Sequence, residues 1–144
     1  MRTGAVIAAA VPFVWLGMVL AISFLEAPLK FRAPGITVPL GLGIGRLVFR
    51  ALNAAEIVLA AVLVVAGAVT GMPPGPWVLF ACLAVLLAIQ VLVLRPRLDR
   101  RAVAILAGQS ISRSHHHLAY IALEAAKVLV LISLGVGLAT EVPS

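Results

Sequence analysis

The chain has 144 residues, of which 63% are hydrophobic and 11% are charged, and its formal net charge is +6. Its mean hydropathy of +1.19 lies above the range of soluble domains, which excludes an ordinary soluble enzyme or binding domain. Because a membrane-spanning helix needs about 20 apolar residues, the length allows about four spans with short connections. We therefore predict an all-α, polytopic membrane protein that forms a single domain over residues 1–144.

Apolar stretches and helix breakers divide the chain into helices. The first stretch is uncharged and longer than the apolar region of a secretory signal peptide, so we expect it to stay attached as a helix. The run Gly71-Met72-Pro73-Pro74-Gly75-Pro76 ends the second stretch, because proline lacks an amide donor and glycine favours a turn. The predicted four-transmembrane-helix bundle has helices at about 4–28, 46–70, 77–94 and 116–140, with cytoplasmic loops at 29–45 and 95–115.

Basic residues are distributed unevenly between the two ends of these helices. Arg2 alone lies on the side of the termini, whereas nine basic residues flank the first and third connections: Lys30, Arg32, Arg46, Arg50, Arg95, Arg97, Arg100, Arg101 and Arg113. The positive-inside rule then predicts an N-out, C-out topology in the plasma (inner) membrane. We attribute the positive charge to this topology and to the anionic headgroups of membrane lipids, and expect no nucleic acid as a partner.

Charged residues inside the predicted spans are the main functional signal. A carboxylate or an ammonium in hydrocarbon costs a few kcal/mol even on insertion scales, so Glu56, Glu124 and Lys127 need an explanation. Helical phase places polar residues of the second and fourth helices on one stripe each. We predict a cytoplasm-open polar cleft between these helices, in which Lys127 pairs with Glu124 or Glu56. Its candidate ligand-binding or proton-relay residues are Glu26, Arg46, Arg50, Asn53, Glu56, His117, Tyr120, Glu124 and Lys127.

Two classes of function fit such a cleft. It could bind or transport a small anionic or amphiphilic ligand, or it could relay protons through its carboxylates. Alternatively, Glu124 and Lys127 could pair on their own helix while Asn53 and Glu56 form interhelical hydrogen bonds. That alternative describes a structural or assembly subunit of a larger membrane complex, or a homo-oligomer.

The consecutive histidines His115, His116 and His117 raise the question of a metal or a haem. Consecutive residues point in three directions on a helix, so only His116 and His117 are expected to approach the bundle interior. We expect no cofactor, and keep a metal or haem at these two residues as an alternative. No nucleophile or hydrolase motif is present, and Cys82 stands alone, so catalytic residues stay unknown.

The third connection contains an amphipathic pattern. Apolar residues recur at helical spacing, while the charged residues cluster on the opposite side. This pattern predicts a short helix that lies in the cytoplasmic interface and covers the cleft; a basic loop that only enforces topology is the alternative. The apolar residues are Leu98, Ala102, Ile105 and Leu106.

Short motifs in the first third of the chain resemble a known group. The motifs are Trp15-Leu16-Gly17, Glu26-Ala27-Pro28-Leu29-Lys30-Phe31 and Gly45-Arg46-Leu47-Val48-Phe49. They resemble the four-helix membrane proteins of the TMEM205-like (DUF4149) type. The resemblance implies a helical bundle and no established chemistry.

A second resemblance concerns the second helix. Arg50-Ala51-Leu52-Asn53-Ala54-Ala55-Glu56 is similar to a pattern in the MAPEG group of membrane enzymes, with one spacer residue fewer. This resemblance implies a glutathione-dependent enzyme in which Arg50, Asn53 and Glu56 bind glutathione. It is the alternative function to the binding or relay protein.

Overall fold

The computed structural model describes residues 2–108 and 116–141 and shows an all-α bundle. Within these residues, four helical stretches are long and apolar enough to cross a membrane: Thr3–Arg32, Val38–Thr70, Pro74–Leu106 and Leu118–Ala139. We call them the first to fourth spans. The predicted fold class and the expected number of long helices are therefore confirmed.

Two of the spans are composite helices that contain a short π-helical segment. The first span combines α1, η1, α2 and η2, and the third combines α4, η3 and α5. The elements in chain order are α1 Arg2–Val19, η1 Leu20–Glu26, α2 Ala27–Leu29, η2 Lys30–Arg32, α3 Val38–Thr70, α4 Pro74–Ile89, η3 Gln90–Leu94, α5 Arg95–Leu106 and α6 His116–Ala139.

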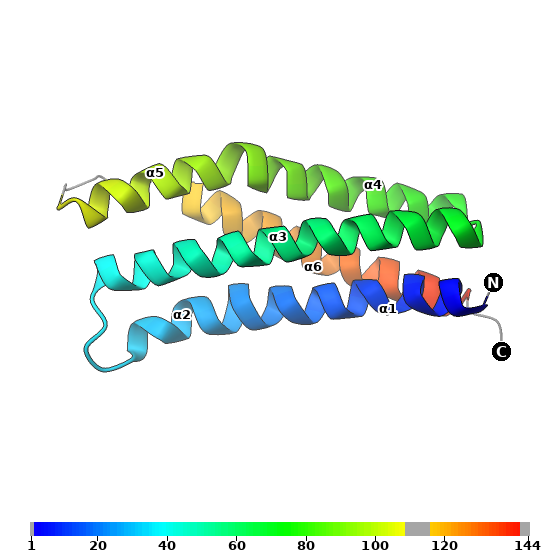
Figure 1. Ribbon diagram of the computed structural model, residues 1–144, viewed down its shortest axis with the longest axis horizontal. Helices are drawn as coiled ribbons and strands as arrows, with labels where there is room; N and C mark the ends of the chain where they lie inside the picture. The colour runs from blue at the N-terminus through cyan, green and yellow to red at the C-terminus, as the bar shows by residue number, and fades with distance from the viewer. Residues whose placement is uncertain (1, 109–115, 142–144) are drawn as a thin grey trace.

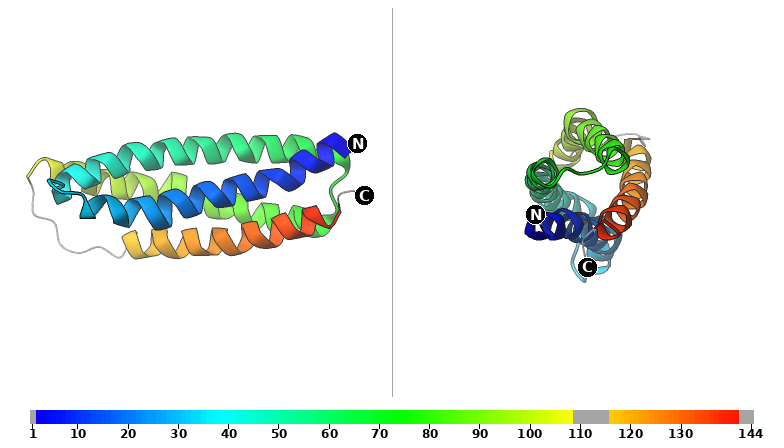
Figure 2. Two further views of the ribbon diagram at one scale, coloured as in Figure 1. Left: turned by 90° about the horizontal axis from the view of Figure 1, so that it is seen from below. Right: turned by 90° about the vertical axis from the view of Figure 1, so that its right-hand side faces the viewer.

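The spans run antiparallel to their chain neighbours, so α1 begins and α6 ends at the same end of the bundle (Figure 1). The first span contacts both α3 and α6, while α4 contacts α6 and α5 contacts α3. Figure 2 shows the resulting ring of helices along the bundle axis. We call the opposite end, where η2 leads into α3 and α5 ends, the loop end. With four spans, the start of α1 and the end of α6 lie on the same side of the bundle (Figure 1).

The second helix begins eight residues before the predicted Arg46, which corrects the proposed loop at 29–45. Thr37 caps α3 by accepting a hydrogen bond from the Leu40 amide at 3.2 Å. Gly41 and Gly45, which lie in the predicted loop, are contact residues within α3. A Cβ on Gly41 would overlap the Phe31 ring, so a larger residue would force this ring of η2 away from α3.

The third connection is also more helical than predicted. Residues 95–106 form α5, which continues the third span directly and is not a separate helix lying across the bundle (Figure 1). Its side chains reach α3 through Asp99, whose Oδ1 lies 3.8 Å from Arg46 Nε. The prediction of a helix here was right, and the prediction of a separate interfacial cover was wrong.

Each π-helical segment ends two residues before a proline. Pro28 follows η1 and Pro96 follows η3. A proline inside a helix cannot donate to the carbonyl four residues earlier, and its ring crowds that carbonyl. The wider π-helical turn makes room for the proline ring. In it the amides of Ala27 and Arg95 donate to the carbonyls five residues earlier, those of Ile22 and Gln90. The prolines therefore account for the place where the two spans change their winding.

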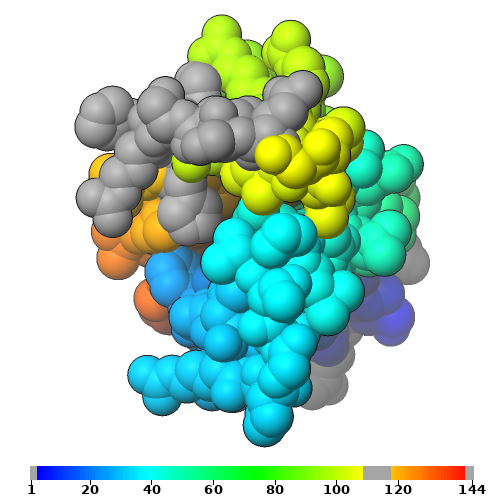
Figure 3. All heavy atoms as spheres, turned by 90° about the vertical axis from the view of Figure 1, so that its left-hand side faces the viewer, coloured from blue at the N-terminus to red at the C-terminus, as the bar shows by residue number. Residues whose placement is uncertain are grey.

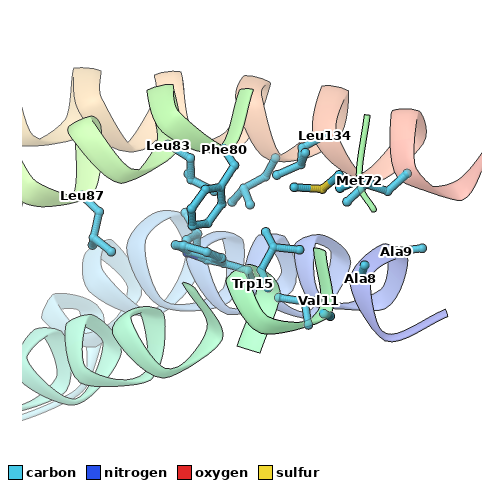
Figure 4. Close-up of a cluster of buried hydrophobic side chains, with 14 residues drawn as sticks. Ala8, Ala9, Val11, Trp15, Met72, Phe80, Leu83, Leu87 and Leu134 are labelled. Carbon is cyan, nitrogen blue, oxygen red and sulfur yellow. The ribbon is translucent and has the colours of Figure 1, made fainter. Parts of the chain in front are cut away.

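The apolar core fills the half of the bundle nearer the termini. Trp15 is fully buried in this core and faces Phe80 and Leu83 of α4, as Figure 4 shows. Leu63 of α3 and Leu131 of α6 are also fully buried in this cluster. Outside it, long apolar side chains are exposed along every span, as expected for helices that face lipid.

Candidate functional site

Charged and polar side chains meet halfway along the bundle, at the inner limit of the apolar core. We call this group the buried cluster. The exposed fractions of Glu56, Glu124 and Lys127 are 0%, 1% and 0%. All four spans contribute to the cluster, whose members are Trp15, Ser23, Asn53, Glu56, Gln90, Glu124 and Lys127.

Glu56 lies near the middle of α3 and is held from three helices. The Trp15 indole donates to its Oε2 at 2.7 Å, and the Lys127 ammonium lies 2.5 Å from the same oxygen. The Asn53 amide, one turn earlier on α3, donates to Oε1 at 3.0 Å. Both oxygens of this carboxylate therefore accept hydrogen bonds from nitrogen donors.

Glu124 lies one turn before Lys127 on α6, and their Oε1 and Nζ atoms are 2.7 Å apart. The Gln90 amide donates to the same oxygen at 2.5 Å. The Ser23 hydroxyl lies 2.5 Å from Oε2 and is the one oxygen partner in the cluster. Ser23 and Gln90 both belong to π-helical segments, η1 and η3, so the two irregular turns carry the side chains that reach Glu124.

The charge balance of the cluster is unequal. Lys127 supplies one ammonium, and it is shared by the carboxylates of Glu56 and Glu124. With all three groups ionised the cluster carries a net charge of −1, arranged without exposure to solvent. Such a charge is costly in a medium of low dielectric constant unless another group neutralises it.

The structure tests the sharpest sequence expectation directly. Both predicted ion pairs of Lys127 are present, and Glu56 and Glu124 turn toward each other through this lysine and away from lipid. The pairing prediction is confirmed. The predicted opening toward the cytoplasm is not seen at these residues, because the side chains of all four spans close around them.

A second polar layer lies between the buried cluster and the loop end. The Arg95 guanidinium lies 4.8 Å from the Tyr120 ring and 5.0 Å from the Phe49 ring. Arg95 also approaches Asp99 at 3.5 Å, and Asp99 connects it to Arg46 at the surface. Figure 3 views this end, where the start of α3 in cyan lies against the end of α5 in yellow. We call Phe49, Arg95, Asp99 and Tyr120 the aromatic layer.

Other predicted site residues lie apart from the buried cluster. Glu26 approaches Lys30 at 3.7 Å at the loop end, and Arg46 is half-buried beside Asp99. Arg50 is exposed, so it does not share a site with Asn53 and Glu56, as the glutathione hypothesis would need. The side chains of His116 and His117, named for a metal or for the cleft, lie outside the described residues.

Sequence reasoning did not include Trp15, Ser23 and Gln90 among the site residues. Gln90 lies near the cytoplasmic end of the predicted helix at 77–94, but the third span continues to Leu106, which puts Gln90 near the middle. Trp15 lies in the uncharged first stretch. The one signal in the sequence that could have pointed to Trp15 is general: a buried indole usually finds a hydrogen-bond acceptor for its N–H group.

Replacing Trp15 with phenylalanine should test the indole contact. The aromatic bulk stays, but Glu56 Oε2 loses one of its two donors, so we expect the free energy of unfolding to fall by about 1 kcal/mol. Detergent unfolding followed by circular dichroism measures this change. Trp77→Phe, at the start of α4, is the matched control. An equal loss in both variants would mean that indole size, and not the hydrogen bond, is responsible.

Comparisons with known proteins return no match, whether the chain is compared with family models, with curated proteins or with solved structures.

Proposed function

We propose that this protein takes up and releases a proton at the buried cluster, within a bundle that spans a membrane. The observation that carries the proposal is one ammonium enclosed between two carboxylates at the middle of all four spans. A proton is the smallest ligand that brings the net charge of this group from −1 to zero. It also needs no cavity, which suits a site closed on every side by packed side chains.

An anionic ligand is supported less well than a proton. The positive charge of Lys127 is already divided between Glu56 and Glu124, so an arriving anion would increase the negative charge of the cluster. Arg50, which was expected to attract an anion, is exposed and separate from it. The geometry therefore favours proton relay over the binding of anions within the bundle.

The hydrogen bonds indicate which oxygen would hold the proton. Amide, indole and ammonium nitrogens donate to three of the four carboxylate oxygens and cannot accept a proton from them. The fourth oxygen, Glu124 Oε2, faces the Ser23 hydroxyl, which can donate or accept. If Glu124 Oε2 carries the proton, it donates to the Ser23 hydroxyl, which then accepts a hydrogen bond instead of donating one. Every contact of Glu124 is kept in this arrangement. Glu56 Oε1 could hold the proton only if the Asn53 amide turned over.

The orientation in the membrane is part of the same proposal. Nine basic residues flank the connections at the loop end and one lies at the other end, which supports a loop end in the cytoplasm near anionic lipid headgroups. The proton would then reach a depth near the bilayer midplane.

Infrared difference spectroscopy across a pH titration tests the proton site. Wild-type protein in lipid nanodiscs should show the carbonyl stretch of a buried carboxylic acid, and Glu124→Gln should lose this band because the carboxyl that carries the proton is gone. Glu26→Gln is the matched control, since Glu26 pairs with Lys30 outside the cluster. A band that survives in Glu124→Gln and disappears in Glu56→Gln would move the proton to Glu56. Absence of any such band in the wild type would refute the proposal and favour a purely structural ion cluster.

A further inference from the structure

Tyr120 is a buried polar residue that the bonding of the cluster does not use. It lies on α6 one turn before Glu124, on the side of the loop end, and only 4% of its surface is exposed. Its hydroxyl makes no hydrogen bond of good geometry among the described residues, and neither does Asn53 Oδ1. The Asn53 side chain nevertheless lies close enough to interact with the hydroxyl. Unpartnered buried polar atoms are rare in native proteins, and usually mark a place where water or a ligand binds.

The ring of Tyr120 is fixed from two sides. Phe49 of α3 meets it edge to face, with centroids 5.7 Å apart and an interplanar angle of 84°. The Arg95 guanidinium covers it at 4.8 Å. This packing fixes the ring, and the hydroxyl lies within electrostatic reach of Glu124 and Lys127. The Arg95 side chain is 13% exposed and lies closer to solvent. The hydroxyl thus stands between the surface and the carboxylates.

We propose that Tyr120 is the residue through which protons pass between the loop end and Glu124, with water held by the Tyr120 hydroxyl and Asn53 Oδ1 as the carrier. This inference rests on the proposed function of the cluster. A hydronium ion gives a proton to the tyrosine oxygen while the hydroxyl's own proton passes to the Glu124 carboxylate, directly or through one water. Tyrosine is unchanged, hydronium becomes water, and the carboxylate becomes a carboxylic acid.

The charges around this route select protons over larger cations. Arg95 faces Tyr120 from α5, and Lys127 lies beyond Glu124 on α6, so a cation that enters must pass one positive charge and meets another. Glu56, paired with Lys127, is the remaining ionisable group of the cluster. A proton does not have to pass the positive charge of Arg95, because it moves by exchange along hydrogen bonds and no ion has to cross the aromatic layer.

Time-resolved infrared spectroscopy after a pH jump tests the route with Tyr120→Phe. This variant keeps the ring and its contacts with Phe49 and Arg95 and removes only the hydroxyl. We expect the Glu124 carboxylic acid band to reach its wild-type final amplitude, but about a hundredfold more slowly or slower still, since a positioned proton-transfer group commonly contributes factors of this size. The thermal midpoint should stay close to the wild-type value, because the hydroxyl makes no direct hydrogen bond of good geometry among the described residues and a bridging water is lost at little cost.

The possible outcomes separate the two proposals. A wild-type rate in Tyr120→Phe overturns the route and leaves the proton site intact. A reduced final amplitude in Tyr120→Phe also overturns it, because Tyr120 would then belong to the binding site. If the wild-type protein lacks the carboxylic acid band and Glu124→Gln leaves the spectrum unchanged, the proposed function itself is refuted.

Discussion

Lys127→Met is expected to lower the free energy of unfolding by about 3–5 kcal/mol, the usual cost of leaving a buried charge without its partner. Methionine fills much the same volume, so the change removes charge and donors more than packing. Both Glu56 and Glu124 lose their cation, at exposures of 0% and 1%. Unfolding in mixed micelles, followed by the fluorescence of Trp15 beside the cluster, measures the loss.

Lys30→Met provides the matched control for this result. Lys30 carries the same charge, but its partner Glu26 is 3.7 Å away and 35% exposed, and its ammonium also faces the rings of Phe31 and Phe49. We therefore expect a smaller loss, of about 1–2 kcal/mol. A triple variant with Lys127→Met, Glu56→Gln and Glu124→Gln removes all three charges together. It should recover a large part of the stability, because a neutral core has no ion to desolvate. Equal losses for Lys30→Met and Lys127→Met would contradict the charge argument.

The two glutamates should respond differently to the same substitution, although both are buried and paired. Glu124→Gln preserves each contact: its amide oxygen accepts from Gln90 and Lys127, and its amide nitrogen donates to Ser23. It also removes the excess negative charge. We therefore expect a stability within about 1 kcal/mol of the wild type.

Glu56→Gln should be the more damaging change, with an expected loss of about 1–3 kcal/mol. If the new amide oxygen accepts from Trp15 and Lys127, the amide nitrogen must face the Asn53 amide, which is also a donor. The Asn53 side chain must turn over or the contact breaks. Unfolding in mixed micelles measures the free energies of unfolding of Glu56→Gln and Glu124→Gln for comparison. A larger loss in Glu124→Gln than in Glu56→Gln would show that the oxygen and nitrogen assignments in the cluster are reversed.

Sequence alone identified the carboxylates and the lysine because the penalty for a charge in hydrocarbon does not depend on the fold. It also placed Asn53 with Glu56, and Glu124 with Lys127, since residues three apart share a helix face. The first and third spans gave no comparable information. Between Trp77 and Leu94 the one strongly polar residue is Gln90, so hydrophobic periodicity could not say which face of that helix turns inward.

The amino-acid sequence by itself determined that this chain forms four long apolar helices and that its intramembrane charges must find one another. These follow from composition, hydropathy and local spacing, which act within single segments. Only the tertiary structure decided that Trp15, Ser23 and Gln90 complete the cluster and that the cluster is closed. It also decided that α3 and α5 extend through the expected loops. The rotation of one helix against another, and the close approach at Gly41, depend on packing between distant segments, which no local pattern specifies.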